Sequence, residues 1–382
     1  MAGRGTAPRL LGLSFLLLAC AQARRVTIDN TQPRRTTDGR LMDVHDGNIV
    51  QWQRGGRYFW YGMGYQNCTE RTGWIPPFQC PGIYQPFGAC GFRTDHALHV
   101  YSSADLVTWS FEGDALPAHT RPRGVYFRPK VVYNQRTAEF VLWINLLYEA
   151  SATQTPLAAY PNATYLVAVS AAPAGPFRVV QPSAFLQARG AGDLSILVDG
   201  DEAYVAYDAW SNGHRVKVEK LDDRFYNAVA SPSTPTLTPS SNEAPVLFKR
   251  NGWYYLLYGH TCCFCKGGAG AHVMVASHPL ANWTDMKIDL NPRKPWSLSE
   301  HVIPSQNNYV FTAQVLKASA EAIEYVFTAD LWSSAADHLK SHDRQFWAPL
   351  SFDDTVTPPS ISLLSWINSF QLNLTEPSRA NV

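Results

Sequence analysis

Five segments rich in aromatic and β-branched residues recur along this chain, and most of them follow a turn signal. Gly-containing triplets at 54–56, 199–201 and 250–252 supply three of these turns. Another apolar segment precedes most of the five, so each pair predicts a β-hairpin. Repeated hairpins leave few ways to bury a common core. The five segments are 57–62, 139–144, 203–207, 253–258 and 323–328, and the preceding ones include 49–52, 130–133, 194–198 and 246–249.

A third element follows several of the hairpins. Residues 99–109 are similar to residues 273–283, and 167–177 are a looser copy. Each has a strand, a turn that begins with serine, and an aromatic residue that opens an outer strand. Five four-stranded units of this kind predict an all-β protein, a five-bladed β-propeller, with a β-sandwich as the alternative. Helical periodicity is short, so helical turns are expected only at 318–322 and 333–340.

The first 23 residues have the pattern of a secretory signal peptide. Two arginines precede an apolar stretch at 10–18, and Ala21-Gln-Ala23 is a small-x-small cleavage site. We therefore expect a secreted or extracellular protein that begins at Arg24. A bacterial lipoprotein signal ending at Cys20 is the alternative. No later apolar run reaches the length of a transmembrane helix, so no membrane span is expected.

The rest of the chain shows no boundary between domains. We expect an N-terminal extension at 24–40, one propeller domain at 41–375 and a tail at 376–382. The formal net charge of +1 gives no electrostatic reason to expect nucleic acid as a partner. Charged residues make up 16% of the chain, whereas Trp and Tyr number 12 and 18. This balance suits sheet cores and the stacking of aromatic rings on sugars, so we expect the protein to bind a polysaccharide or oligosaccharide. We also expect a monomer.

Six cysteines remain after the signal segment, at Cys68, Cys80, Cys90, Cys262, Cys263 and Cys265. An even number in an exported chain predicts disulfides, and the sequence leaves their pairing open. Adjacent Cys262 and Cys263 are not expected to bond to each other. Bridges from the trio of Cys262, Cys263 and Cys265 to the insertion at 65–95 would hold in place a loop that has no hydrophobic core of its own. A zinc site with His260 and His272 is the alternative. Four sequons predict N-glycosylation, at Asn67, Asn162, Asn282 and Asn373.

Acidic residues stand where the innermost strands of several predicted blades begin. In a propeller these strand starts face the central channel, so they meet although they lie far apart in the sequence. Glycoside hydrolysis needs a carboxylic acid that protonates the leaving oxygen and a carboxylate that activates water or attacks the sugar. A third acid can keep the pKa of the first one high. The alternative is that each acid only caps a strand turn. The residues at these starts, from blade one to blade five, are Asp46, Arg128, Asp193, Glu243 and Gln306.

The same motifs resemble glycoside hydrolase family 43, a family of five-bladed propeller glycosidases, over roughly residues 40–370. The resemblance implies an inverting mechanism in which Asp46 deprotonates water and Glu243 protonates the leaving oxygen. It also implies that Asp193 raises the pKa of Glu243. The matching segments are 46–49 and 57–61 in blade one, 103–109 in its outer strand, 193–201 in blade three and 243–256 in blade four.

Within this family the exo-β-1,3-galactanase branch is the most similar, through the motifs around His45, Arg128 and Gln306. This likeness implies that these three residues contact the substrate. Two positions depart from the branch, because Asp46 stands where the branch has Gly and Phe127 where it has a substrate-contacting Glu. The acid and base of the wider family are therefore present, and the sugar remains open among galactan, arabinan and xylan types.

Two further side chains are expected at the pocket, Trp210 and His260, either lining it or packing beside it. Many relatives hold calcium at the propeller centre, but the sequence shows no cluster of residues with oxygen ligands, so no cofactor or metal is assigned. A carbohydrate-binding propeller without catalysis is the second functional hypothesis. Phe127 and the 65–95 insertion favour it, because the insertion could cover the channel.

Overall fold

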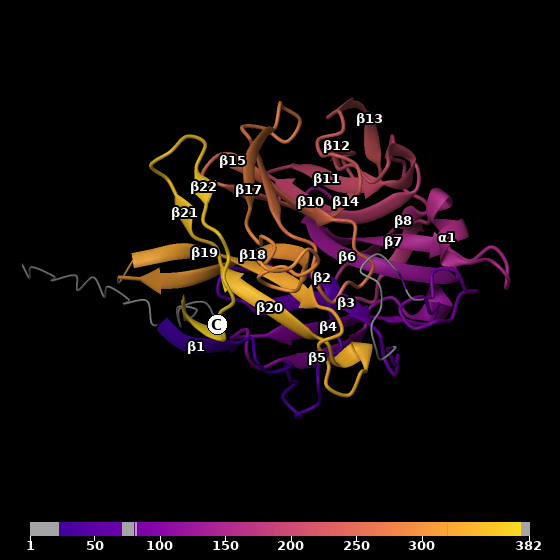
Figure 1. Ribbon diagram of the computed structural model, residues 1–382, viewed down its shortest axis with the longest axis horizontal. Coiled ribbons are helices and arrows are strands. Elements are labelled where there is room, and N and C mark those ends of the chain that lie inside the picture. Colours follow the sequence, from indigo (N-terminus) through magenta and orange to yellow (C-terminus); the bar gives the residue numbers. More distant parts are fainter. Residues whose placement is uncertain (1–22, 71–79, 81, 319, 376–382) are drawn as a thin grey trace, which may run out of the picture.

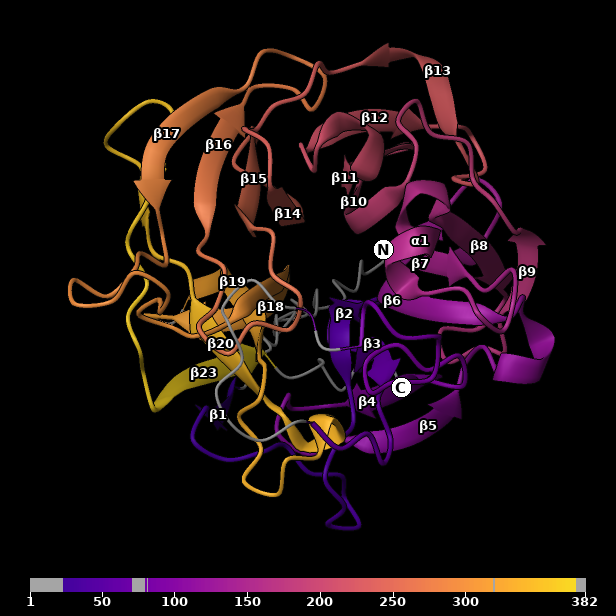
Figure 2. The same cartoon turned by 45° about the vertical axis from the view of Figure 1, so that its right-hand side comes forward.

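The computed structural model describes residues 23–70, 80, 82–318 and 320–375, which form a five-bladed β-propeller (Figure 1). In each of the first four blades, four strands follow one another in sequence order from the centre to the rim (Figure 2). The predicted all-β propeller is therefore confirmed, and the β-sandwich alternative is wrong. Of the expected signal peptide at 1–23, residues 1–22 lie outside the described residues, as does the expected tail at 376–382.

The first four blades contain β2 to β17. Blade one comprises β2 (His45–Gln51), β3 (Tyr58–Gly64), β4 (Ala97–Ser103) and β5 (Ser110–Asp114), and blade two comprises β6 (Gly124–Asn134), β7 (Glu139–Tyr148), β8 (Thr164–Ser170) and β9 (Arg178–Gln181). Blade three comprises β10 (Ala191–Asp199), β11 (Glu202–Ala209), β12 (Lys217–Leu221) and β13 (Ala228–Ser233). Blade four comprises β14 (Asn242–Arg250), β15 (Trp253–His260), β16 (His272–Ala276) and β17 (Thr284–Asp289).

The fifth blade joins the two ends of the described chain. It is built on β18 (Gln306–Lys317), β19 (Ala320–Leu331) and β20 (Arg344–Pro349). Strand β1 (Ala23–Asp29) pairs along its whole length with β23 (Ser369–Thr375), and β23 meets β18 at the pair Val315 and Leu374. The segment expected as an N-terminal extension thus begins with a strand of the fifth sheet. A small hairpin of β21 (Phe352–Asp353) and β22 (Ser360–Ile361) follows β20.

Helical structure in the described residues is limited to short pieces. The turn expected at 318–322 is wrong, because residues 320–322 begin β19, and a 3₁₀ turn starts only at the end of the 333–340 segment. No helix in the described ranges is long and apolar enough to cross a membrane. The pieces are α1 (Pro156–Ala159), η1 (Ala118–Thr120), η2 (Tyr160–Asn162), η3 (Trp210–Asn212) and η4 (Lys340–His342).

The hydrophobic core is divided among the interfaces between neighbouring blades. Side chains of a strand alternate between its two faces, so a strand buried on both faces serves two interfaces. In β15, Tyr255 and Leu257 pack towards blade five, whereas Leu256 and Tyr258 pack towards blade three. Clusters of the same kind fill the interfaces of blades five and one, one and two, and two and three. This two-sided burial explains why the repeated segments are almost continuously apolar.

Every innermost strand carries a register shift at the same place. Such β-bulges bend a strand and redirect its side chains, and they occur often next to active sites. Asp46, Arg128 and Ala244 adopt left-handed backbone conformations there, with φ of 64°, 53° and 53°. The bulges therefore redirect side chains locally in all five innermost strands. The shifts lie within 45–48, 127–130, 191–194, 243–246 and 307–309.

The six cysteines form three disulfides, Cys68–Cys90, Cys80–Cys263 and Cys262–Cys265. The expected bridge between the cysteine trio and the insertion is confirmed by Cys80–Cys263, which joins residues 183 positions apart. The zinc alternative is wrong, because all three thiols of the trio are used in disulfides. Cys80–Cys263 fastens the insertion of blade one to the loop that follows β15, whereas Cys68–Cys90 lies within the insertion and Cys262–Cys265 within the loop.

Candidate active site

The three predicted acids lie at the bulges of three innermost strands, β2, β10 and β14. Their positions within the bulge differ, which corrects the expectation of equivalent positions. Glu243 is the last paired residue before the bulge of β14. Asp46 is the first unpaired residue in the bulge of β2, and Asp193 is the second unpaired residue in the bulge of β10. The repeat thus brings three strand starts together, and the bulge selects which side chain each strand turns inward.

Arg128 is a buried cation between two of these acids. Its Nη2 lies 2.9 Å from Asp193 Oδ2, and its Nε lies 3.6 Å from Asp46 Oδ1. Its Nη1 donates hydrogen bonds to Asn307 O and Asn308 Oδ1, at 2.6 and 2.8 Å, and these anchor it to blade five. The side chain is 3% exposed. Although burial opposes its charge, the carboxylates around it raise the pKa of Arg128, so it remains a cation.

Asp46 is held from two sides. The Tyr65 hydroxyl donates to Asp46 Oδ2 at 2.8 Å, and the backbone N–H of Asp46 donates to Asp330 Oδ2 at 2.8 Å. Burial raises the pKa of Asp46, while Arg128 acts in the opposite direction. Asp46 is 3% exposed, so it presents little surface to solvent.

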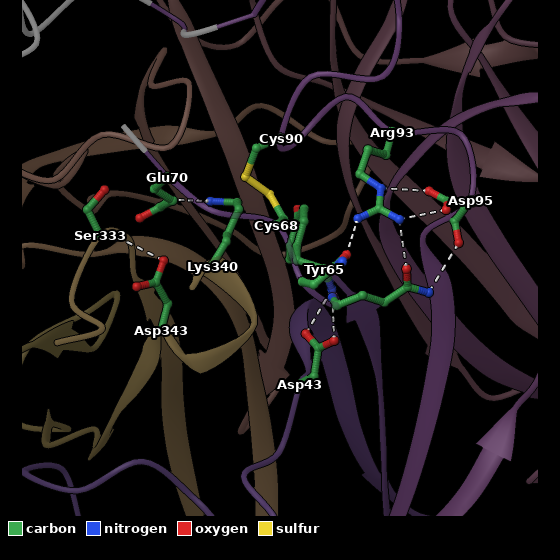
Figure 3. Close-up of a disulfide and its surroundings, with 12 residues drawn as sticks. Asp43, Tyr65, Cys68, Glu70, Cys90, Arg93, Asp95, Ser333, Lys340 and Asp343 are labelled. Carbon is green, nitrogen blue, oxygen red and sulfur yellow. Dashed lines mark hydrogen bonds and ion pairs between the residues drawn. A yellow bond between two sulfur atoms is a disulfide. The ribbon is translucent and has the colours of Figure 1, made fainter. Parts of the chain in front are cut away.

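The corner that carries Tyr65 is fixed by charged side chains (Figure 3). Asp43 accepts the backbone N–H groups of Tyr65 and Gln66, each at 2.8 Å. Lys340 reaches in from η4, pairs with Glu70 at 3.2 Å and lies 5.0 Å from the centre of the Tyr65 ring. The hydroxyl that contacts Asp46 therefore stands on a rigid support.

Glu243 accepts two hydrogen bonds on one oxygen. Oε1 receives the backbone N–H of Cys262 at 2.5 Å and the amide of Gln306 at 2.7 Å. The Gln306 amide is oriented in turn by Trp332, whose Nε1 donates to Gln306 Oε1 at 2.9 Å. Burial and the negative charges of Asp193 and Asp208 raise the pKa of Glu243 well above its usual range. A carboxyl with a high pKa can stay protonated and donate a proton near neutral pH.

Asp208 is an acid that the sequence analysis missed. It lies at the end of β11, is 1% exposed, and accepts the backbone N–H of Asp193 at 2.8 Å on Oδ1. The Asp193 side chain itself is 19% exposed and is open to a ligand beside Arg128. Asp208 carries no motif of its own, and its role depends on pairing between β10 and β11.

Tyr160 is a second residue without a sequence signal, since it lies in the irregular connection from β7 to β8. Burial and the negative charge of Glu243, followed by that of Asp193, raise its pKa, which places the phenol among the acids. The ring stacks on Trp210, with centroids 6.0 Å apart and 13° between the planes. Trp210 is 37% exposed. Trp210, the exposed member of this aromatic pair, therefore lies next to a phenol that faces the acids.

The remaining predicted residues differ in exposure. His45 was expected to contact substrate, but its side chain is fully buried and its Nδ1 lies 3.3 Å from Asp330 Oδ1. It therefore supports Asp46 through Asp330 instead of facing the channel. Gln306 is 4% exposed and contacts Glu243. His260 is exposed at the end of β15 and meets His272 edge-on, with ring centroids 5.3 Å apart.

Phe127 is covered by the insertion. Its ring contacts Phe92 and Phe264, each with a centroid distance of 6.0 Å, and it is 8% exposed. It precedes the bulge of β6, as Glu243 precedes that of β14. Residues 71–79 and 81 of the insertion lie outside the described part of the chain. The described part of the insertion thus packs an aromatic and aliphatic cluster around Phe127.

The residues at the centre do not fit a calcium ion. Lys130 Nζ donates to the carbonyl oxygens of Asp46 and Gly47, at 2.6 and 3.2 Å. Burial and the neighbouring charge of Arg128 lower the pKa of Lys130 to about 7. Two basic side chains thus take up oxygens that a divalent ion would need. No group of three or more His, Cys, Asp or Glu side chains in the described residues could hold a metal.

The chain matches a family model and several solved structures. Residues 89–302 match the family model of glycosyl hydrolases family 43. A search of curated proteins found no match. Among solved structures, a family 43 β-1,3-galactosidase aligns with a TM-score of 0.67 and 21% identity, over 91% of this chain and 64% of that chain.

Two exo-β-1,3-galactanase structures align similarly. The one from Clostridium thermocellum has a TM-score of 0.67 and 21% identity, over 93% of this chain and 69% of that chain. The one from Phanerochaete chrysosporium, with galactose, has a TM-score of 0.65 and 23% identity, over 91% and 69%. The chain therefore spans between 64% and 69% of the length of these structures. At these identities the likeness establishes the fold.

Proposed function

Because the chain belongs to glycosyl hydrolases family 43 and is therefore a glycosidase, we propose that it cleaves polysaccharide or glycan side chains with inversion at the anomeric carbon. The observation that supports this most is the cluster of Asp46, Asp193 and Glu243 around the buried cation Arg128. Three blades supply these acids, and their environments differ. Acids with separated pKa values are what acid–base hydrolysis of a glycosidic bond needs.

In the proposed mechanism Glu243 protonates the leaving oxygen. Its high pKa, due to burial and then to the charge of Asp193, keeps the carboxyl protonated until the substrate arrives. Asp46 deprotonates the attacking water on the opposite face of the sugar. Arg128 favours the ionised form of Asp46, and the Tyr65 hydroxyl does the same through its hydrogen bond. An inverting pair of carboxyls stands about 6.5–9.5 Å apart to leave room for that water.

The substrate we propose is a galactan, arabinan or xylan type of side chain, with galactan tested first. The three solved structures described above are a galactosidase and two galactanases, which makes galactan the natural first choice. The stacked pair of Tyr160 and Trp210 offers a platform for a pyranose face. Phe127 and its aromatic neighbours present no polar group to a sugar hydroxyl on that side. We therefore expect a preference that differs from that of the galactanases.

A carbohydrate-binding propeller without turnover is the second candidate. The observation that favours it is the burial of Asp46, which is 3% exposed and lies beneath Tyr65. A water molecule must reach Asp46 for hydrolysis, and a ligand could still bind at Asp193 and Trp210 without it. Sugar binding without sugar release distinguishes this candidate from the enzyme.

The test of function is sugar release from arabinogalactan, arabinan and xylan. Wild type is expected to release reducing sugar from at least one of them, and ¹H NMR of the first product is expected to show the inverted anomer. Glu243→Gln is expected to lose at least about a hundredfold in rate, the low end for a general acid. Glu321→Gln, on the exposed β19 hairpin, is the matched control and is expected to retain full activity. Equal rates for the wild type and Glu243→Gln would contradict the proposal.

We also propose that the protein acts outside the cell as a glycoprotein monomer. Its three disulfides are of the kind that persists in oxidising compartments. The four sequon asparagines are all exposed, so glycans would meet no steric obstacle. Expression in a eukaryotic secretory host, followed by enzymatic removal of N-glycans, is expected to reduce its mass. An unchanged mass would contradict glycosylation. The sequon asparagines are Asn67, Asn162, Asn282 and Asn373.

A further inference from the structure

Behind Asp193 and Glu243 lies a buried acid–histidine contact that the proposed mechanism does not use. Asp208 accepts the backbone N–H of Asp193 on Oδ1, and its Oδ2 lies 2.7 Å from Nδ1 of His214. Asp208 is 1% exposed, whereas the His214 side chain is 22% exposed and reaches solvent. The pair therefore connects a buried carboxylate next to the site with the surface.

The same segment also holds the strand that carries Glu243. The carbonyl oxygen of His214 accepts the backbone N–H of Asn242 at 2.9 Å, and Asn242 directly precedes Glu243. The carbonyl oxygen of Gly213 accepts the N–H of Ser241, also at 2.9 Å. The end of β11 and the short segment after it thus contact the beginnings of both β10, through Asp208, and β14, through His214.

Local backbone features are adapted to this contact. A Cβ atom at residue 192 would collide with the Asp208 carboxylate, so Gly192 permits the carboxylate to approach the bulge of β10. His214 has a left-handed φ of 53°, which turns its ring back over Asp208. The His214 ring also meets Trp210 edge-on, with centroids 5.4 Å apart. The imidazole is therefore fixed between the carboxylate and the exposed aromatic pair.

A similar arrangement lies behind Asp46. Asp330 is the penultimate residue of β19, as Asp208 is of β11. It accepts the backbone N–H of Asp46 and contacts Nδ1 of His45. Two of the three acids at the centre are thus held by their backbone N–H through an aspartate that also contacts a histidine. The recurrence indicates a positioning device, since one buried acid alone could be accidental.

We propose that Asp208 and His214 form a positioning pair that fixes Asp193 and the strand start of Glu243, and thereby controls proton donation by Glu243. This inference rests on the proposed glycosidase function. Charged and titratable groups face Asp208 from each neighbouring element. They are Asp193 on β10, Glu243 on β14, Tyr165 on β8, Tyr160 in η2 and His214 itself.

The electrostatics of the pair give the sign of its effect. Burial raises the pKa of Asp208, and the hydrogen bond from His214 acts against that shift. Burial lowers the pKa of His214, but the hydrogen bond to Asp208 and its negative charge outweigh burial, so the pKa of His214 is raised. The negative charge of Asp208 raises the pKa of Glu243 after burial and Asp193. Glu243 must be protonated to act, so its activity is lost as pH rises through its pKa. Removing the charge of Asp208 therefore moves the alkaline limb of activity to lower pH.

The first experiment does not depend on turnover. The imidazole of His214 is titrated by NMR in wild type and in Asp208→Asn, a variant of the same shape without the charge. The pKa of His214 is expected to fall by on the order of one unit in the variant. An unchanged titration would overturn the pairing.

The second experiment measures the pH profile of kcat/KM. Asp208→Asn is expected to lower kcat/KM about tenfold or more at neutral pH and to move the alkaline limb down by on the order of one unit. His214→Asn tolerates the left-handed backbone and removes the partner that keeps Asp208 ionised, so it moves the limb in the same direction. The double variant is expected to match Asp208→Asn, whereas additive losses would contradict a pair that acts as a unit.

The matched control is His342→Asn. It removes a histidine–aspartate contact of the same length, 2.7 Å, between His342 and Asp337, which is 52% exposed. The control is expected to leave the pH profile unchanged. A wild type without activity would contradict the proposed function, and the NMR titration would still decide the pairing. If the alkaline limb of kcat/KM moved in His342→Asn but not in Asp208→Asn, the inference would be overturned.

Discussion

Arg128 pairs with Asp193 across two blades, with 2.9 Å between Nη2 and Oδ2, and it does so from a left-handed backbone position in the bulge of β6. The bulge is what brings the guanidinium to the axis, because a regular strand would direct this side chain elsewhere. The same guanidinium lies 3.6 Å from Asp46. A single buried cation thus allows two carboxylates to stand close together.

Removal of this cation is expected to destabilise the propeller. Arg128→Met leaves the carboxylates of Asp46 and Asp193 without their buried cation, and breaking a buried ion pair costs about 3–5 kcal/mol in comparable cases. The free energy of unfolding from urea titration measures the loss. Arg136→Met is the control, because Arg136 pairs with Asp223 at 3.1 Å on the exposed surface, where such pairs contribute less than about 1 kcal/mol. Equal losses in the two variants would contradict the role given to Arg128.

The Tyr65 hydroxyl is expected to tune the acidic side of the pH profile. Asp46 must be ionised to act as a base, and the hydrogen bond from Tyr65 stabilises the ionised form. Tyr65→Phe therefore raises the pKa of Asp46 and moves the acidic limb of kcat/KM to higher pH, by on the order of one unit. Tyr61→Phe removes a hydrogen bond to a carbonyl oxygen of Pro173 instead. A limb that moves equally in both variants would exclude a specific effect on Asp46.

Asp193 is expected to affect the alkaline limb of the pH profile of kcat/KM. Its negative charge raises the pKa of Glu243, second to burial. Asp193→Asn therefore lowers the pKa of Glu243, so the alkaline limb of kcat/KM moves to lower pH. Asp201→Asn changes an exposed acid in the turn of the same blade and is expected to have no effect. A profile of Asp193→Asn that coincides with wild type would remove Asp193 from the account.

The disulfide between Cys80 and Cys263 is expected to contribute more to stability than Cys68–Cys90. It closes a segment of 183 residues, against 22 for the other bridge. Loop entropy gives about 5 kcal/mol for the long closure and about 3 kcal/mol for the short one. Urea titration of the two double-alanine variants measures the difference. A larger loss for Cys68–Cys90 would show that local packing outweighs loop length.

The five hairpins could be predicted because each carries its own local pattern of turn and apolar strand. The meeting of Asp46, Asp193 and Glu243 followed from that repeat. Their unequal positions could not be predicted, because a bulge depends on pairing with the next strand. Asp208 could not be predicted for the same reason, because its carboxylate accepts the backbone N–H of Asp193 on the neighbouring strand. The burial of His45 also depends on packing between blades, which no segment reveals alone.

The most direct test of the whole account is the dependence of Glu243→Gln on the leaving group. The assay compares the natural linkage with a dinitrophenyl glycoside of the sugar that wild type releases. A dinitrophenolate leaves without a proton, so it needs no general acid. We predict a loss of at least about a hundredfold on the natural linkage and a much smaller loss on the dinitrophenyl glycoside. Equal losses on both substrates would contradict proton donation by Glu243.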